Sequence, residues 1–152
     1  MLIYKDPCEV IVEGKRITLD NTVYTIIEDN EINDYKTQIL KLANYEEIPV
    51  STFSREIVRT TDFDECSDDI IELLESIIST DGSASYWYAH YVLHDRFELG
   101  EEAIKGTPYL YTYIVTYCSD SPELMLRLSE GTGYYKKFKQ RNMLMKHKFN
   151  CD

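Results

Sequence analysis

The sequence predicts an α+β fold, with a small N-terminal antiparallel β-sheet followed by a mostly helical body of stacked short helices. Three observations support this class. β-Branched runs surround a glycine near the N-terminus, apolar residues then recur at helical spacing, and a tyrosine-rich stretch matches itself. The chain has 152 residues, so we expect a single domain over 1–152. Its predicted parts are a β-meander at 1–27, a helical body at 28–130 and a basic C-terminal segment at 131–152.

The strands are predicted from β-branched runs and the turn residues between them. Val10-Ile11-Val12 and Ile17-Thr18-Leu19 flank Gly14, which is the pattern of a β-hairpin. After a turn at Asp20-Asn21, the run Thr22–Ile27 predicts a third strand. We therefore expect the N-terminal part, 1–27, to form a small sheet.

The helices of the body are predicted in order from the spacing of apolar residues. One helix follows Ile32 and ends near residue 44, a short helix covers about 51–58, and a loop spans 60–65. Ser67 is an N-cap candidate for the next helix, because two acidic residues fill the first turn and six apolar residues between 70 and 78 form one face. A further helix at about 85–96 is apolar or aromatic on every side, so it must be covered on more than one side.

The segment Tyr109–Cys118 fits two structures. Its alternating tyrosines and β-branched residues suit a strand, whereas Thr107-Pro108 places a capping residue before a proline at the first helical position. We favour the helix. Ser121-Pro122 repeats the same start signal for another helix, and Gly131 and Gly133 separate that helix from the basic segment.

A shifted self-match predicts helical repeats, since Tyr86-Trp87-Tyr88-Ala89 aligns with Tyr109-Leu110-Tyr111-Thr112. The pattern Tyr88-Ala89-x-x-Val92-Leu93-x-x-Arg96-Phe97-x-x-Gly100-Glu101-x-Ala103-Ile104 resembles a short tyrosine-rich repeat found in tandem in uncharacterised phage and bacterial proteins. The chain departs from the pattern at Asp95, where a glycine is expected, and its second copy lacks the Arg-Phe-x-x-Gly-Glu half. The resemblance implies a helical-repeat protein and brings no activity.

Charge is distributed unevenly along the chain. The net charge is −11, yet residues 131–151 hold six basic residues and no acidic one, whereas residues 1–130 hold 26 acidic and 10 basic residues. Opposed charges on one chain predict either self-docking or charged partners. The 13 tyrosines favour half-buried layers and contact surfaces, because tyrosine joins an apolar ring to a polar tip.

Few residues have the spacing of a metal or catalytic site. His90 and His94 lie four apart, as zinc ligands on one helix face do, but Tyr91 stands where a zinc protease needs glutamate. The alternative is two structural histidines bonded to tyrosines or carboxylates. Cys118 beside either histidine is a weaker candidate for nucleophilic catalysis. We therefore assign no catalytic residue, metal or cofactor from the sequence.

The basic segment is the best candidate for a partner-binding surface. This segment mixes aromatic rings with cations. That composition can bind nucleic acid or an acidic protein. Alternatively, it can form an amphipathic helix whose cations pair with the acidic body. The candidate residues are Tyr134, Tyr135, Lys136, Lys137, Phe138, Lys139 and Arg141.

From these features we expect a non-enzymatic protein-binding module, a phage-encoded inhibitor or modulator of a host protein. Two alternatives stay open. The acidic body could mimic nucleic acid and occupy a DNA- or RNA-binding protein, or His90 and His94 could serve a metal-dependent enzyme. A nucleic-acid partner is not favoured, because the body beside the basic segment would repel a polyanion.

The sequence also indicates a location. Cys8, Cys66, Cys118 and Cys151 form no close pair, which argues against a zinc ribbon or a Cys-x-x-Cys site and favours reduced thiols. Neither a basic-plus-apolar leader nor an apolar run of about 18–20 residues is visible. We expect a cytoplasmic protein, in the host cytoplasm if phage-encoded, with no membrane partner.

Overall fold

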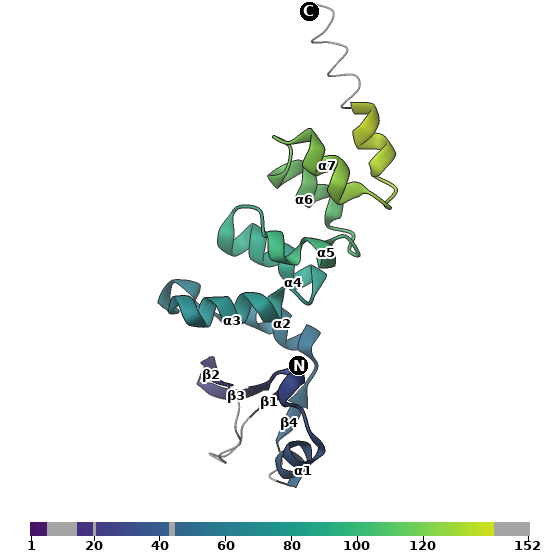
Figure 1. Cartoon of the computed structure of the whole chain (residues 1–152). Coiled ribbons are helices and arrows are strands. Elements are labelled where there is room, and N and C mark those ends of the chain that lie inside the picture. The colour runs from purple at the N-terminus through teal and green to yellow at the C-terminus, as the bar shows by residue number, and fades with distance from the viewer. Residues whose placement is uncertain (6–14, 20, 43–44, 142–152) are drawn as a thin grey trace, which may run out of the picture. The chain divides into compact units, whose positions relative to one another are not determined.

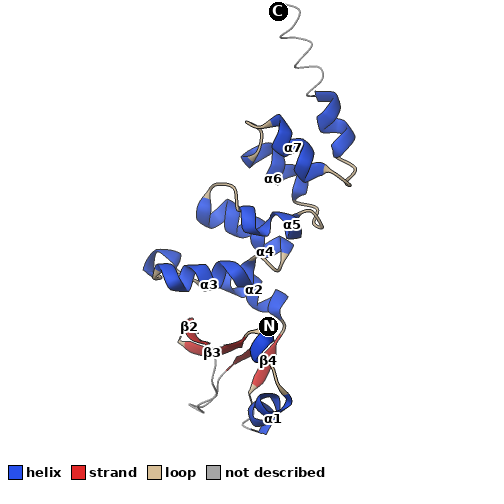
Figure 2. Ribbon diagram, viewed as in Figure 1, coloured by secondary structure: helices blue, strands red, loops and turns tan. Residues whose placement is uncertain are grey.

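A computed structural model of the chain describes residues 1–5, 15–19, 21–42 and 45–141. It divides into two compact units, Met1–Thr80 and Asp81–Asp152. The first unit combines an antiparallel four-stranded sheet with helices, and the second is helical over its described residues (Figure 1, Figure 2). The predicted α+β class is confirmed, while the single domain over 1–152 stays a prediction.

The sheet of the first unit has the strand order β2-β3-β1-β4. Its strands are β1 (Leu2–Lys5), β2 (Lys15–Leu19), β3 (Thr22–Ile27) and β4 (Glu46–Ile48). β2 and β3 match the predicted second and third strands, and Val10-Ile11-Val12 lies outside the described residues. β1 and β4 were not predicted, because neither short strand carries an alternating apolar pattern. β4 also extends the sheet beyond the predicted N-terminal segment, which ended at Ile27.

The helices of the first unit follow the predicted order. They are α1 (Asp34–Leu42), α2 (Val50–Thr60) and α3 (Asp68–Ile78), with 3-10 turns η1 (Asp29–Glu31) and η2 (Phe63–Glu65). One apolar cluster joins Tyr4 and Ile27 of the sheet to Leu40 of α1 and to Tyr45. Ser54 Oγ on α2 lies 2.8 Å from the Ile77 carbonyl oxygen of α3. This hydrogen bond satisfies a buried hydroxyl between the two helices.

The second unit is built from short helices joined by tight turns. They are α4 (Gly82–Trp87), a π-helical turn η3 (Tyr88–Leu93), η4 (Glu98–Gly100), α5 (Glu101–Ile104), α6 (Leu110–Tyr117) and α7 (Pro122–Ser129), followed by a helix at 135–141. The helical prediction for Tyr109–Cys118 is confirmed by α6. Among the described residues, no helix is long and apolar enough to cross a membrane.

The predicted helix at 85–96 is wrong at both ends. It begins at Gly82, because the Asp81 carboxylate accepts a hydrogen bond from the Ala84 amide and caps the first turn. It ends at Leu93 in a π turn, because His94 adopts the left-handed conformation with φ 52° and its amide donates to the Ala89 carbonyl oxygen. The left-handed residue is therefore the neighbour of Asp95, where the repeat pattern led us to expect glycine.

The structure aligns the two copies of the repeat differently from the sequence match, so the predicted alignment of Tyr86 with Tyr109 is wrong. Thr107 Oγ1 donates to the Ile104 carbonyl oxygen and accepts from the Tyr109 amide, and Thr132 makes the same two bonds to Ser129 and Tyr134. Thr107 and Thr132 are 25 residues apart. Three buried rings recur at the same interval: Tyr88, Tyr113 and Phe138. The rings of Tyr86 and Tyr109, which the sequence match equates, instead stack on each other with centroids 4.6 Å apart.

Candidate partner-binding surface

The helix at 135–141 is attached to the rest of its unit by aromatic rings. Tyr111 on α6 is the centre of this attachment: its ring lies 5.6 Å from that of Phe138 and 5.3 Å from that of Tyr134. Phe138 is 1% exposed. Because a buried aromatic ring stabilises mainly by removing apolar surface from water, these contacts fix one side of the helix.

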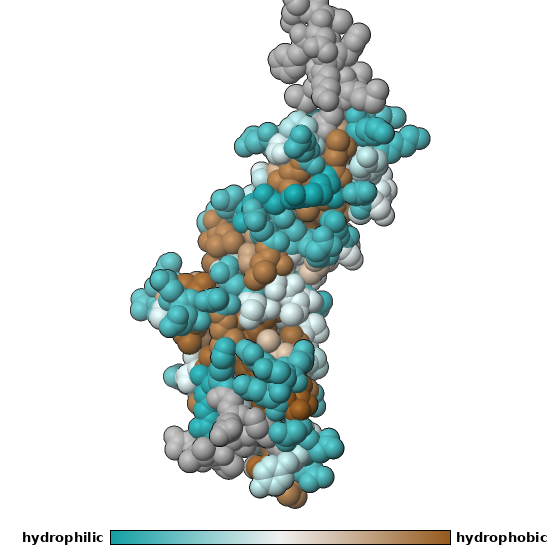
Figure 3. Space-filling model, in the orientation of Figure 1, coloured by the Kyte–Doolittle hydropathy of each residue, from teal (hydrophilic) through white to brown (hydrophobic). Residues whose placement is uncertain are grey.

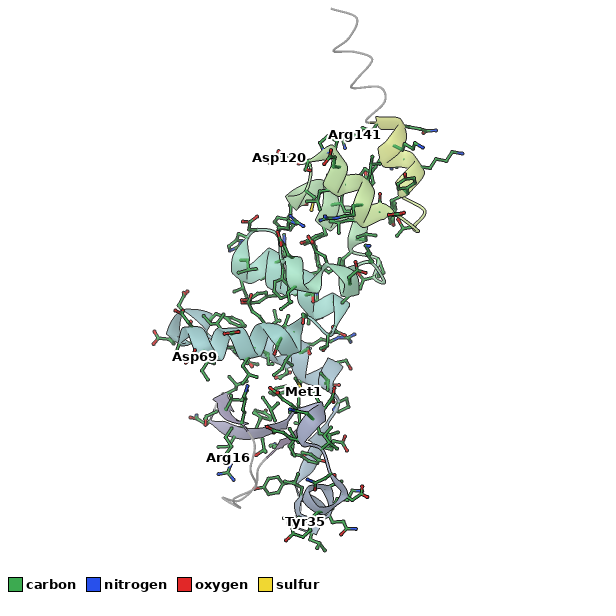
Figure 4. All side chains as sticks on the ribbon, viewed as in Figure 1. Met1, Arg16, Tyr35, Asp69, Asp120 and Arg141 are labelled. Atoms are coloured by element: carbon green, nitrogen blue, oxygen red, sulfur yellow. The ribbon has the colours of Figure 1, made fainter. Side chains whose placement is uncertain are left out.

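The cations of this helix lie at the surface. Lys136, Lys137, Lys139 and Arg141 are exposed, and none forms an ion pair with a carboxylate of the described residues. Lys137 Nζ lies 4.7 Å from the centroid of the Tyr111 ring. Side chains ending in nitrogen extend from this helix away from α6 and α7 (Figure 4), and teal hydrophilic atoms stand beside paler and brown ones on its visible face (Figure 3).

The predicted binding residues therefore separate into two groups. Phe138 belongs to the core, because the second unit covers its ring, and its assignment to the partner surface is corrected. Tyr134 and Tyr135 are half-buried, and Lys139 Nζ lies 6.0 Å from the Tyr135 ring centroid. The four cations are the part that a partner can reach. Lys146, His147 and Lys148 lie outside the described residues.

Among the described residues of the second unit, none of these cations pairs with a carboxylate, and pairing with the acidic residues of the first unit stays a prediction. The helix is amphipathic, as that alternative required, but rings and not ion pairs hold it in place. An exposed cation that has no carboxylate partner within its own unit is free to pair with an acidic partner protein, and each such pair in water contributes about 0–1 kcal/mol.

The two histidines do not face each other as paired ligands. His90 lies on η3, with Nδ1 2.9 Å from the Tyr117 hydroxyl and its ring stacked on Tyr86. His94 is exposed at the left-handed end of η3. Within the described part of the chain, no group of three or more His, Cys, Asp or Glu side chains could hold a metal ion. The structural alternative for His90, a bond to tyrosine, is the arrangement observed.

Cys118 is not activated as a nucleophile. The thiol is buried, and burial together with the nearby Glu101 carboxylate raises its pKa to about 11. A thiol is reactive as the thiolate, so a raised pKa makes Cys118 inert at neutral pH. Burial also raises the pKa of Cys66.

Sequence reasoning missed a buried charge network in the second unit. Arg96 Nε and Nη2 donate to the two carboxylate oxygens of Glu101 at 2.7 and 2.8 Å. The Tyr113 hydroxyl donates to Glu101 Oε2 at 2.6 Å and accepts from the Phe97 amide at 2.9 Å. Glu101 is 6% exposed. The hydrogen bond to Glu101 raises the pKa of Arg96, and burial raises the pKa of Tyr113 above its usual range.

The repeat pattern contained the signal for this network. Arg96, Phe97, Gly100 and Glu101 are its Arg-Phe-x-x-Gly-Glu half, and the structure gives each a role in packing. A Cβ at Gly100 would overlap the side chain of Ser85. The pattern therefore describes how the unit folds and not what it binds.

Neither family models, nor curated protein sequences, nor solved structures match this chain.

Two open surface hollows are found among the described residues. One of about 420 Å³ is lined in the first unit by Lys15, Glu28, Asp69, Glu72, Leu73 and Ser76. The other, of about 350 Å³, is lined in the second unit by Arg96, Ser121, Glu123, Leu124 and Arg127. Arg96 is already bonded to Glu101 and also pairs with Glu98 at 3.1 Å. Neither hollow is lined by a histidine or a cysteine.

Proposed function

We propose that this chain is a non-enzymatic protein-binding module that inhibits or modulates a host protein, as a phage-encoded protein acting in the host cytoplasm would. The observation that carries the proposal is the helix at 135–141, which is anchored by rings on one side and presents Lys136, Lys137, Lys139 and Arg141 on the other. Because ring contacts already hold the backbone of this helix in place, docking of a partner has little of that backbone left to order.

The arrangement of the second unit supports the same proposal. Stacked short helices present ridges and grooves, and repeat proteins use such surfaces for binding. Tyr91 and Leu99 are 68% and 61% exposed on this unit. Exposed apolar side chains such as these can add apolar contacts when a partner docks on this unit.

The proposal is tested by affinity purification of the tagged full-length chain from nuclease-treated host lysate. The matched bait carries Lys136→Gln, Lys139→Gln and Arg141→Gln, which leaves Lys137 on Tyr111. We expect one stoichiometric protein with the wild-type bait and its loss with the variant. If no protein is enriched above a charge-matched control bait, the binding-module proposal is wrong.

A second candidate function, an acidic nucleic-acid mimic, is supported by the surface of residues 62–75. This segment has seven acidic residues and no basic one: Asp62, Asp64, Glu65, Asp68, Asp69, Glu72 and Glu75. On α3, the helical period places Asp68, Glu72 and Glu75 in one row, opposite the buried Leu74 and Ile77. A mimic would compete with DNA or RNA for its target, so unchanged nucleic-acid binding by the captured partner would exclude this role.

A further inference from the structure

We propose that the helix at 135–141 binds a carboxylate-rich helical segment of its partner protein, and this inference rests on the proposed binding function. The helical period puts Lys136 nearly opposite the buried Phe138, with Lys137 and Lys139 about 100° to either side of Phe138. Three cations therefore surround the solvent-facing side of the helix. Carboxylates one turn apart on a partner helix can meet them, because residues three or four apart share one helix face.

The rings beside the cations are not arranged to stack on nucleic-acid bases. Tyr111 already contacts Phe138, Tyr134 and the Lys137 ammonium group, and Tyr135 has Lys139 over its ring. Binding of a single strand without sequence preference depends on open ring faces as well as on cations.

The length of the partner's charged segment is limited by the rest of the chain. Residues 81–130 of the same unit carry eight acidic and three basic residues, so a long polyanion would gain attraction at the helix and meet repulsion from the rest of the unit. The cations from Lys136 to Arg141 span about 7.5 Å of helix axis. A short acidic segment matches the length of these described cations.

An anionic membrane is also a poor fit for this helix. A helix that lies on a membrane inserts an apolar face between the lipids. Here the apolar side is already occupied, because Phe138 is 1% exposed and stacks on Tyr111. Inserting Phe138 would first require breaking that contact.

The test measures fluorescence anisotropy of a labelled helical peptide of about 15 residues with glutamates at i and i+4 spacing, titrated with the full-length chain. We expect saturable binding that weakens as salt rises, and at least about a 10-fold loss with Lys136→Gln, Lys139→Gln and Arg141→Gln together. The variant with Lys136→Arg and Lys139→Arg keeps both charges and should retain binding. The matched control, Lys5→Gln with Lys41→Gln and Lys105→Gln, makes the same change in charge elsewhere and should leave binding unchanged.

Three outcomes would overturn the inference. These are equal affinity of the wild-type chain and the helix variant, tighter binding to an oligothymidine of similar length than to the peptide, and tighter binding to phosphatidylserine vesicles. Circular dichroism of the variant checks that its fold is intact. A captured partner that the helix variant retains would leave the binding function standing and reject this surface. Peptide binding without any captured protein would support this surface and reject the proposed binding of a host protein.

Discussion

The two units bury polar groups in different ways. In the first unit, the fully buried residues are mostly aliphatic or aromatic, and its buried polar side chains, Thr25 and Ser54, are uncharged. In the second unit, the described residues include two buried carboxylates, Asp81 and Glu101. One caps α4 and the other holds Arg96 and Tyr113. The first unit therefore depends on apolar packing and sheet hydrogen bonds, and the second also depends on a charged network.

This difference follows from the residue types that each unit has to bury. The described core of the first unit is mostly isoleucine, leucine and phenylalanine, whose side chains have no polar atoms to satisfy, and its buried tyrosines are Tyr4 and Tyr45. Tyr113 and Tyr88, which are 0% and 2% exposed, bring hydroxyls into the core of the second unit. A buried hydroxyl costs about 1–3 kcal/mol when unpaired. The carboxylate of Glu101 meets that requirement for Tyr113, and Arg96 in turn balances the carboxylate.

The largest expected effect comes from removing the centre of the network. Glu101→Ala leaves the Arg96 guanidinium without its bidentate partner and the Tyr113 hydroxyl without its acceptor. We expect a loss of about 3 kcal/mol, because the Tyr113 hydroxyl loses its acceptor and Arg96 loses two charge-assisted hydrogen bonds, while Arg96 keeps its ion pair with Glu98. Urea denaturation followed by the fluorescence of the single tryptophan, Trp87, reports on the second unit.

The neighbouring residue supplies the control for this substitution. Glu102 is exposed and pairs with Lys105 at 3.2 Å, so Glu102→Ala should leave the midpoint of unfolding nearly unchanged. Similar losses for the two substitutions would show that the network does not stabilise the second unit.

Alkaline pH should destabilise the second unit through Cys118. Its pKa is raised from 9.0 to about 11 by burial, so between these values the folded state keeps a proton that the unfolded state has lost. The free energy of unfolding therefore falls as pH rises through this window, by on the order of 2 kcal/mol. Tyr113, whose pKa is also raised by burial, changes stability in the same direction at higher pH.

Urea midpoints measured by Trp87 fluorescence between about pH 8 and pH 11 follow this loss. In the Cys118→Ala variant, the urea midpoint should change less with pH below about pH 10. This holds whatever the substitution does to stability at neutral pH. An equal slope in Cys118→Ala and the wild type would reject the assignment to this thiol.

A smaller loss is expected from deleting one hydroxyl of the network. Tyr113→Phe keeps the buried ring but leaves the Phe97 amide without its acceptor. We expect a loss of about 1–3 kcal/mol, the cost of one unsatisfied buried group. Tyr111→Phe, which keeps the ring contacts to Phe138 and Tyr134, is the control and should cost less. If both substitutions cost the same, the Tyr113 hydroxyl has no special role.

Much of the fold could be predicted because its signals are local. The start of α7 was visible from Ser121-Pro122, and the Ser121 hydroxyl does accept from the Leu124 amide. The helix α3 was visible from its apolar face. The strands β1 and β4 were missed, since their pairing joins segments far apart in the sequence, such as Ile3 with Ile48, and no local pattern marks it.

The candidate surface was only partly predictable, because composition does not say which side of a helix is buried. The sequence marked both Phe138 and the lysines as binding residues, and packing on Tyr111 decided between them. The register of the repeat was misread for a related reason. Residue identity favoured Tyr86 and Tyr109 as equivalent positions of the repeat. The buried rings and the hydrogen bonds of the turns instead make Tyr113 and Phe138 equivalent.

The smallest expected effect tests that equivalence directly. Thr107→Val and Thr132→Val each remove a hydroxyl that donates to a helix carbonyl and accepts from the amide two residues later. If the two turns are equivalent, each substitution should cost about 1 kcal/mol, as loss of a helix cap does. Thr116→Val on the exposed side of α6 is the control for the change of shape and polarity.

Hydrogen exchange should show the loss at Thr132 as faster exchange of the amides of 135–141, the helix that carries the cations. A cost at Thr107 without one at Thr132 would mean that the second turn does not hold that helix in place, and the partner surface would then depend on the Tyr111 contacts alone.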